Sequence, residues 1–225
     1  MCGRFTLTVD PAELQAQFNK YTFPPKFAPR FNVAPTQPIL VIPNDGENTA
    51  DFFVWGLIPM WAKDPTIGNR LINARGETLE EKPAFRGSLK YKRCLILADG
   101  FYEWKSFGGR KTKTPYFIHM KDRKPFAFAG LWDSWNSPDG SLVKSCTIIT
   151  TEPNEVVSMI HNRMPVILHP RDYDKWLDTS PQTPENLKPL IKPFPSEEMS
   201  AYPVSTMVNK AQNDTPELVV PLQTE

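Results

Sequence analysis

Cys2 is the residue whose position gives it the most distinctive chemistry in this chain. It follows the initiator methionine, and a small second residue permits removal of that methionine, which leaves Cys2 with a free α-amine beside its thiol. An α-amine has a pKa of about 7.7–8.0, so much of it is neutral near pH 7 and can attack an aldehyde to form a Schiff base. The thiol can then add to the imine carbon and close a thiazolidine ring. The alternative is that Cys2 is only a small residue after the methionine.

A second candidate is the carboxylate of Glu103, which has three aromatic neighbours in the segment Asp-Gly-Phe-Tyr-Glu-Trp at residues 99–104. Aromatic surroundings desolvate a carboxylate and raise its pKa, which suits a general acid or base. The alternative is a glutamate at a strand edge with its carboxylate in water.

Two further polar side chains suit proton transfer and orientation. His161 follows an expected helix and titrates near neutrality, so it can shuttle protons, although a histidine at a helix end can also be structural. Asn73, in Asn73-Ala74-Arg75, carries an amide that both donates and accepts hydrogen bonds. We expect His119 and His169 to be structural, and Cys94 and Cys146 to be buried packing residues.

Three arginines lie close in sequence to these polar candidates. Arg4 is near Cys2, Arg75 is near Asn73 and Arg163 is near His161. If the segments converge, the three guanidinium groups would form a cradle for phosphate groups. The alternative is three unrelated surface arginines.

Two loops bounded by proline carry apolar groups that suit stacking on unpaired bases. Pro35 closes the first, at residues 32–35, and Trp61 ends the second, at residues 55–61. We expect Trp55 to be part of the core and Trp61 to be exposed.

The overall charge conceals a strong polarity along the chain. Lys plus Arg is 26 and Asp plus Glu is 25, for a net charge of +1. Residues 1–81 carry −2, residues 82–124 carry +9 and residues 125–225 carry −6. The middle segment, which includes Lys82, Arg86, Lys90, Lys92 and Arg93, could attract a polyanion although the whole chain is nearly neutral. Within it, residues 110–113 could instead be a solvated hairpin tip.

These residues must be positioned by short elements, because proline makes up 24 of 225 residues against a usual share of about 5%. Alternation or apolar runs predict strands at residues 4–9, 37–43, 51–56, 93–98, 101–105, 114–120, 125–133 and 142–150. Helices are predicted from Pro11 to about Asn19, near 76–81, at 152–160 with Pro153 in the first turn, and near 170–177 and 184–191. Residues 20–36 are predicted to be a proline-rich loop and residues 57–92 to be mixed in secondary structure.

From these elements we expect an α+β fold in a single domain spanning residues 1–225, with a mostly antiparallel, barrel-like β-sheet core and short peripheral helices.

The composition also bounds the setting of the protein. The sequence has no run of about 18 apolar residues, so no membrane span is predicted. The first residues lack the features of a secretory signal. Three cysteines without a CxxC pair and three histidines make a disulfide framework or a metal site improbable, which favours a reducing cytoplasm. Nothing in the sequence demands more than a monomer.

Taken together, these segments resemble the SRAP (SOS-response-associated peptidase) family of abasic-site processing proteins, with matching pieces from residue 2 to about residue 209. The order of Cys2, Asn-Ala-Arg, a glutamate in an aromatic strand and His-x-Arg-Met-Pro is highly specific. The matching segments are residues 1–5, 32–35, 55–61, 73–75, 99–104, 161–165, 203–205 and 208–209.

The resemblance implies a β-rich fold and a protein that binds abasic sites in single-stranded DNA, where Cys2 forms a stable thiazolidine with the deoxyribose aldehyde. It implies that Asn73 positions the Cys2 amine and the opened sugar, that Glu103 manages the proton of that amine, and that His161 relays protons to the sugar oxygen.

The resemblance also implies phosphate contacts by Arg4, Arg75 and Arg163, and contacts of Pro35 and Trp61 with unstacked bases. It implies autoproteolytic removal of Met1, a β-lyase side activity, no metal or organic cofactor, and association with the nucleoid when the protein is bound to damaged DNA.

Two other functions remain compatible with the same residues. An N-terminal-nucleophile amidase or peptidase would also use a free Cys2, as a thiolate that attacks an amide. A single-stranded DNA-binding protein without covalent chemistry would bind intact and abasic strands equally well.

Overall fold

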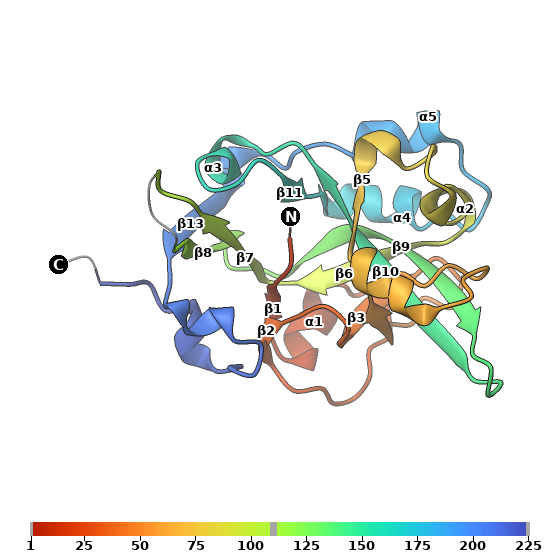
Figure 1. Cartoon of the computed structure of the whole chain (residues 1–225), viewed down its shortest axis with the longest axis horizontal. Coiled ribbons are helices and arrows are strands. Elements are labelled where there is room, and N and C mark those ends of the chain that lie inside the picture. The colour runs from red at the N-terminus through yellow and green to blue at the C-terminus, as the bar shows by residue number, and fades with distance from the viewer. Residues whose placement is uncertain (1, 109–111, 224–225) are drawn as a thin grey trace.

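Two β-sheets meet around the N-terminal segment of the chain (Figure 1). The computed structural model describes residues 2–108 and 112–223. The strands are β1 (Phe5–Leu7), β2 (Arg30–Val33), β3 (Pro38–Pro43), β4 (Asp51–Trp55), β5 (Asn73–Arg75), β6 (Arg93–Ala98), β7 (Gly100–Lys105), β8 (Thr114–Met120), β9 (Phe126–Asn136), β10 (Leu142–Thr151), β11 (Met164–Pro165), β12 (Ile167–Leu168) and β13 (Met199–Pro203).

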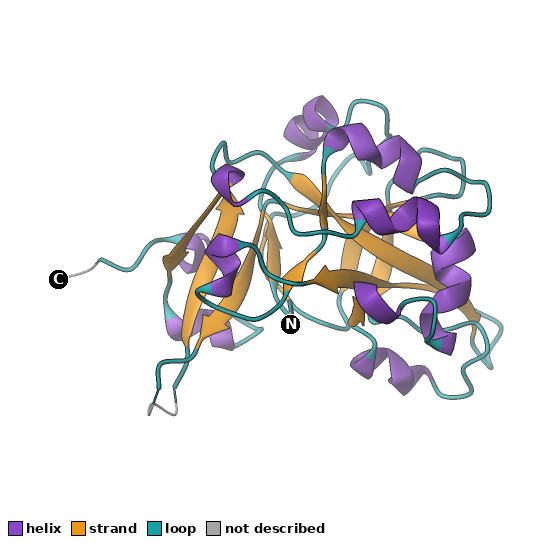
Figure 2. Ribbon diagram, turned by 90° about the horizontal axis from the view of Figure 1, so that it is seen from above, coloured by secondary structure: helices purple, strands orange, loops and turns teal. Residues whose placement is uncertain are grey.

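Short helices cover the outside of the sheets (Figure 2). The α-helices are α1 (Pro11–Gln17), α2 (Pro83–Tyr91), α3 (Glu155–Ser158), α4 (Tyr173–Trp176) and α5 (Pro184–Leu187). The 3₁₀ helices are η1 (Pro65–Arg70), η2 (Gly76–Thr78), η3 (Pro170–Asp172), η4 (Lys188–Leu190), η5 (Ser196–Glu198), η6 (Thr206–Asn209) and η7 (Pro216–Val219).

The larger sheet closes on itself as a barrel. Its strands run in the order β11-β10-β4-β3-β6-β9-β12. Because β9 also pairs with β10, the strands β10, β4, β3, β6 and β9 form a closed ring. Within this ring only β4 and β10 are parallel, while the other pairs are antiparallel. The smaller sheet has the order β13-β8-β7-β1-β2. This arrangement confirms the α+β fold with a mostly antiparallel, barrel-like core.

Phe5 connects the two sheets through aromatic packing. Its ring lies 5.2 Å from the ring of Trp55 and 5.9 Å from that of Phe128, measured between centroids. Phe101, on the strand beside β1, packs on Phe128 at 6.0 Å. Aromatic contacts of this kind add to the free energy of burial. The first strand, which belongs to the small sheet, is therefore packed against the barrel. The expectation that Trp55 belongs to the core is confirmed.

Most of the predicted elements are present close to their expected bounds. The first helix begins at Pro11, and the carboxylate of Asp10 accepts a hydrogen bond from the backbone N–H of Glu13 at 2.8 Å, as an N-cap does. The predicted strands at 37–43 and 51–56 pair as an antiparallel hairpin. His119 lies in β8 as expected, and Cys94 and Cys146 are fully buried.

Two local predictions are wrong. The segment expected to be a loop at 20–36 contains β2, because pairing with β1 supplies its hydrogen bonds and a proline-rich sequence gives no sign of that pairing. The region expected to be mixed, 57–92, does combine strand and helix, although β5 and α2 were not predicted individually. Pro153 precedes the helix expected at 152–160, since Asn154 is the N-cap and accepts from Val157 N at 3.0 Å.

The part of the chain that the structure describes contains no helix that is both long and apolar enough to cross a bilayer.

Candidate site around Cys2

Cys2 lies three residues before Phe5, where β1 begins, and hydrogen bonds hold this segment on two sides. On one side the chain is anchored to β7, because Tyr102 N–H donates to the Arg4 carbonyl oxygen at 3.0 Å. On the barrel side, Asn73 Nδ2 donates to the Cys2 carbonyl oxygen at 2.8 Å. The Cys2 side chain is fully buried, and burial, with a smaller contribution from the charge of Glu103, raises the pKa of its thiol. The thiol is therefore protonated near neutral pH.

Glu103 lies on β7, opposite Tyr116 of β8. Its exposed fraction is 2%, which rules out the alternative of a carboxylate in water. Burial raises the pKa of Glu103 to about 7, against the opposing charge of Lys113. A carboxyl group with such a pKa exists in both protonation states at neutral pH, as a general acid–base catalyst requires.

Asn73 reaches this position because β5 pairs in parallel with β10, where Asn73 is opposite Ile148. While its Nδ2 donates to Cys2, its Oδ1 is buried and has no hydrogen-bond partner among the described residues. A buried acceptor without a partner is unfavourable, so this oxygen is placed to accept a hydrogen bond from a group that enters the site.

His161 follows α3 and is oriented by its own loop. His161 Nδ1 lies 3.1 Å from the Arg163 backbone nitrogen and 3.3 Å from the Arg163 carbonyl oxygen, so the backbone of Arg163 holds the ring through this nitrogen. Burial, together with the charge of Lys113, lowers the pKa of His161, so the neutral ring predominates near pH 7. Because Lys113 acts on both Glu103 and His161, these two candidates lie on the same side of the molecule.

Arg163 is engaged by an acidic partner that the sequence reasoning did not single out. Its Nη1 and Nη2 donate to the two carboxylate oxygens of Glu77 at 2.6 and 2.9 Å, and Nη2 also donates to the Thr150 carbonyl oxygen at 2.7 Å. A DNA phosphate at this guanidinium would have to share or replace Glu77. The signal in the sequence was the position of Glu77, two residues after Arg75.

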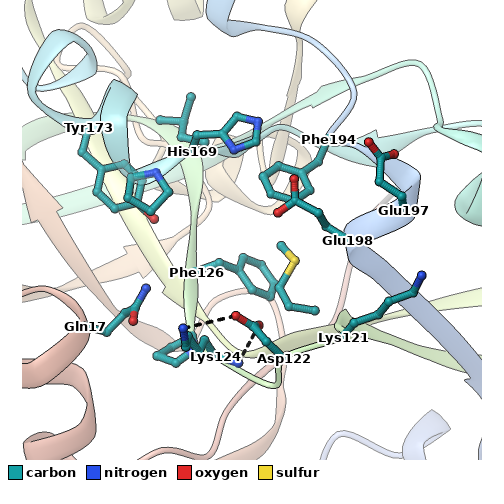
Figure 3. A pocket seen from close by; sticks show the side chains of 14 residues that line it. Gln17, Lys121, Asp122, Lys124, Phe126, His169, Tyr173, Phe194, Glu197 and Glu198 are labelled. Atoms are coloured by element: carbon teal, nitrogen blue, oxygen red, sulfur yellow. Dashed lines mark hydrogen bonds and ion pairs between the residues drawn. The ribbon is translucent and has the colours of Figure 1, made fainter.

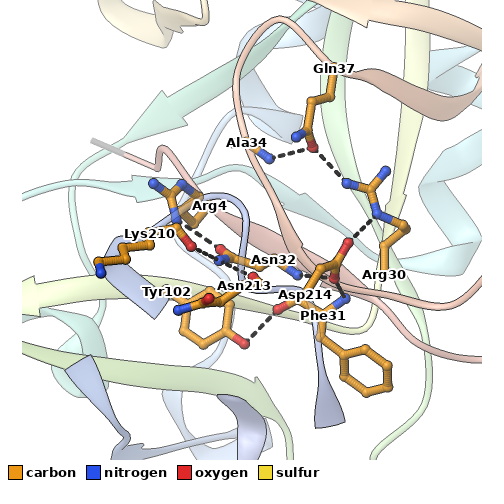
Figure 4. Close-up of polar contacts among 10 residues, drawn as sticks. All are labelled: Arg4, Arg30, Phe31, Asn32, Ala34, Gln37, Tyr102, Lys210, Asn213 and Asp214. Atoms are coloured by element: carbon orange, nitrogen blue, oxygen red, sulfur yellow. Dashed lines mark hydrogen bonds and ion pairs between the residues drawn. The ribbon is translucent and has the colours of Figure 1, made fainter. Parts of the chain in front are cut away.

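Arg4 is fixed by a polar network that includes the C-terminal segment (Figure 4). Its Nη1 donates to Asn32 Oδ1 at 2.9 Å and to the Val208 carbonyl oxygen at 2.6 Å. Asp214 accepts hydrogen bonds from the backbone N–H groups of Phe31 and Asn32 and pairs with Arg30 at 2.5 Å. Neither Asn32 nor Asp214 was predicted as a site residue: Asn32 orients Arg4, and Asp214 holds the backbone of Asn32.

The remaining predicted residues are exposed or half-buried. Arg75 is exposed at the end of β5, next to the Thr150 position of β10. Pro35 is half-buried in the turn between β2 and β3. Trp61 has an exposed fraction of 56%, which confirms the prediction that it faces solvent.

The structure thus joins Cys2, Asn73 and Glu103 directly by contact or charge. His161 and Glu103 both interact electrostatically with Lys113. Within the described residues, Arg4 shares no hydrogen-bond partner with Arg163, whereas Arg75 and Arg163 both border Thr150.

A separate cavity of about 460 Å³ lies at the turn that connects β8 with β9 (Figure 3). Its lining includes His169, Tyr173, Glu198 and Lys121, and none of the predicted site residues lines it. Among the residues that the structure describes, no group of three or more His, Cys, Asp or Glu side chains is arranged to hold a metal ion.

A model of the family described as SOS response associated peptidase (SRAP) matches residues 1–211. The chain belongs to the SRAP family. Among its SRAP relatives, abasic site processing protein YoqW of Bacillus subtilis (strain 168) is 50% identical over 222 residues, which cover 97% of this chain and 99% of that protein. Abasic site processing protein HMCES of Gallus gallus is 33% identical over 267 residues, which cover 99% of this chain and 78% of that protein.

Solved structures extend this SRAP assignment to the fold. A crystal structure of a protein from Bacteroides thetaiotaomicron has a TM-score of 0.89 at 28% identity and covers 99% of this chain and 100% of its own. The resemblance drawn from Cys2, Asn73-Ala74-Arg75 and the later motifs is therefore confirmed at the level of the family.

Proposed function

We propose that this protein captures abasic sites in single-stranded DNA as a covalent thiazolidine on Cys2, after removal of Met1. The observation that carries the proposal is the placement of Cys2, whose carbonyl oxygen is held by Asn73 and whose thiol lies in the field of a buried carboxyl group with a pKa near 7. The names of relatives such as YoqW describe abasic site processing, which fits an aldehyde as the target.

The proposed reaction needs no oxidant or cofactor. The neutral amine of Cys2 adds to the open-chain aldehyde, and loss of water gives an imine. The Cys2 thiol then adds across the C=N bond, so that the S–C bond forms and the thiol proton passes to nitrogen. Glu103 accepts and returns the amine proton, and Asn73 Oδ1 accepts a hydrogen bond from the amine. As the sugar ring opens, the protonated form of His161 gives a proton to the ring oxygen and regains one from the C1 hydroxyl group, which becomes the aldehyde.

The DNA strand is gripped by groups that surround this centre. Arg4, Arg75 and Arg163 contact phosphates on either side of the lesion, and Pro35 and Trp61 contact unstacked bases. Arg163 exchanges part of its contact with Glu77 for a phosphate. The imine also acidifies the neighbouring C–H bond, which allows a β-lyase side reaction, and removal of Met1 is the autopeptidase step.

The first test is incubation with single-stranded DNA that contains one abasic site. The wild-type protein is expected to give a heat-stable adduct, which Cys2→Ala abolishes because it removes the thiol that closes the ring. Cys2→Ser keeps the amine and is expected to give an adduct only after reduction of the imine with borohydride. DNA with a tetrahydrofuran analogue, which has no aldehyde, is the control, and an adduct of equal yield with Cys2→Ala would disprove the aminothiol mechanism.

The same experiment separates the two alternative functions. A protonated, buried Cys2 thiol does not favour attack on an amide as a preformed thiolate, and turnover of an amide substrate without DNA would support the amidase. Equal affinity for intact and abasic strands, without a covalent product, would support a binding protein. Intact mass shows whether Met1 has been removed from the sample.

A further inference from the structure

The basic segment 82–124 is not explained by the proposed site, because Arg4, Arg75 and Arg163 all lie outside it. One of its cations has a structural role: Arg93 is fully buried, and its Nη1 donates to the carbonyl oxygens of Leu89 and Lys90 at the end of α2. Lys82, Arg86 and Lys90 remain exposed on and beside the same helix. Their charges face solvent and are accessible to an anionic ligand.

These cations border a groove between α2 and the loop that carries Trp61. The groove has a volume of about 380 Å³, within the range of about 300–1,000 Å³ that is typical of small-molecule sites. Three large apolar side chains line it and are unusually exposed, with exposed fractions of 68% for Met60, 56% for Trp61 and 51% for Tyr91. Such a local concentration of exposed apolar groups is typical of an interaction site.

The walls of the groove are fixed by hydrogen bonds. Asp133 accepts from Met60 N–H at 2.8 Å and pairs with Lys92 at 2.6 Å, so the one carboxylate among the lining residues is already neutralised. Trp135 Nε1 donates to the Ala62 carbonyl oxygen at 2.7 Å and secures the other end of the loop. The aromatic rings are therefore presented on a pre-organised surface rather than on a mobile loop.

The charge at the groove is positive. The helix α2 contains no acidic residue in the segment PAFRGSLKY, and Arg86 lines the groove. Lys90 holds its ammonium group 5.1 Å from the centroid of the Tyr91 ring. Exposed aromatic rings combined with cations along one path are the features by which proteins bind single-stranded nucleic acid, and they do not suit an uncharged apolar partner.

We propose that this groove, here called the α2 groove, binds an unpaired nucleotide of the DNA strand a short distance from the abasic site. The base stacks on the aromatic wall at Tyr91, and Arg86 and Lys90 contact its phosphates. The inference rests on the proposed function, because Trp61 would direct the strand from the lesion into the groove. It adds a second contact area, which makes affinity depend on the length of one flank.

The test measures non-covalent binding by fluorescence anisotropy, with oligonucleotides that carry a tetrahydrofuran analogue at the lesion position. One oligonucleotide has flanks of about eight nucleotides on both sides, and two others are truncated next to the analogue on the 5′ or the 3′ side. With long flanks, Tyr91→Ala is expected to weaken binding about tenfold, since a stacked base contributes about 1–3 kcal/mol. Tyr91→Phe keeps the ring and should bind as the wild type does.

Truncation of one particular flank should remove the difference between Tyr91→Ala and the wild type, while truncation of the other should leave it. The matched control is Phe52→Ala, which removes an aromatic side chain with an exposed fraction of 44% outside the groove and should change nothing. Unchanged affinity of Tyr91→Ala for the long strand, or an equal loss with all three strands, would overturn the inference. Because the analogue has no aldehyde, these results are independent of whether the wild-type protein forms the adduct.

Discussion

At the scale of single residues, the environment of Glu103 decides what its carboxyl group can do. The side chain is almost completely buried, and burial raises its pKa to about 7. The same carboxyl group lies close enough to Cys2 to influence the pKa of the thiol. The proton acceptor that we propose for the Cys2 amine is thus a residue 101 positions away in the chain.

Glu103→Ala is expected to slow adduct formation by about 10²-fold or more, since a positioned acid or base contributes about 10²–10⁴-fold. Affinity for the tetrahydrofuran analogue should change far less, because Glu103 holds no phosphate in the proposal. Single-turnover rates at saturating DNA, compared with anisotropy titrations, measure the two effects. Equal losses in rate and affinity would contradict a role in proton transfer.

The raised pKa of Glu103 also predicts a pH dependence of stability. The folded protein holds this proton up to a pH of about 7, whereas the unfolded chain releases it near 4.5. The contribution to stability is therefore complete below about pH 4.5 and is lost as the pH rises through 7. Glu103→Gln, which cannot ionise, should gain stability relative to the wild type over this window and keep the gain at pH 8.

Thermal melts between pH 3 and pH 8 measure this difference, at about 2–4 °C for each kcal/mol. Glu77→Gln is the matched control of opposite sign, since the hydrogen bond from Arg163 lowers the pKa of Glu77. Its stability deficit should be present at neutral pH and should shrink as the pH falls below about 4.5. A difference between Glu103→Gln and the wild type that does not vary with pH would argue against a raised pKa.

At the scale of elements, contacts between distant segments set the positions of the loops. The helix α2 was not predicted, because Gly87 lowers the helix propensity of its sequence. In the structure, Phe85, Ser88 and Leu89 form a buried face of this helix. Packing of that face against the barrel outweighs the low helix propensity of glycine. The strand β2 was missed because Arg30–Val33 becomes a strand only through pairing with β1. In contrast, the apolar run of β6 and the alternating strands were visible in the sequence.

Gly56 is a point where two backbones approach closely. Its φ is +133°, and a Cβ there would lie 2.6 Å from the Gly68 carbonyl oxygen. Gly56→Ala is expected to destabilise the protein by about 2–4 kcal/mol through backbone strain and steric overlap, as measured by denaturant unfolding. Gly87→Ala is the matched control, because nothing lies within 4 Å of its added Cβ, and it should stabilise α2 by about 0.5–1 kcal/mol.

At the scale of the whole molecule, near-neutrality conceals a segregation of charge along the sequence. The net charge of +1 is compatible with a polyanion as ligand, since the cations near Cys2 and beside α2 are presented locally while the acidic residues of 125–225 lie elsewhere in the sequence. A local cluster of cations is sufficient to bind a few phosphates. A covalent bond to the lesion would then supply the persistence that weak electrostatic contacts lack.

Arg75→Ala is expected to weaken binding to single-stranded DNA and to make the plot of log K against log salt shallower by about one unit, because one phosphate contact is lost. Titrations at several salt concentrations give the slope. Arg171→Ala removes another exposed arginine away from Cys2 and should leave the slope unchanged. An unaltered slope in Arg75→Ala would show that this residue makes no phosphate contact.

The sequence by itself determined the reactive groups and the family, because an aminothiol at Cys2 and the order of the later motifs are properties of residue type and position. It also predicted most strands, since alternation of apolar residues is a local signal. Only the tertiary structure decided that Glu103 is buried, that Asn73 holds a carbonyl group 71 positions away, and that Arg4 and Arg163 already have partners within the protein. Burial and convergence depend on strands paired across long sequence separations, and local patterns carry no information about those pairings.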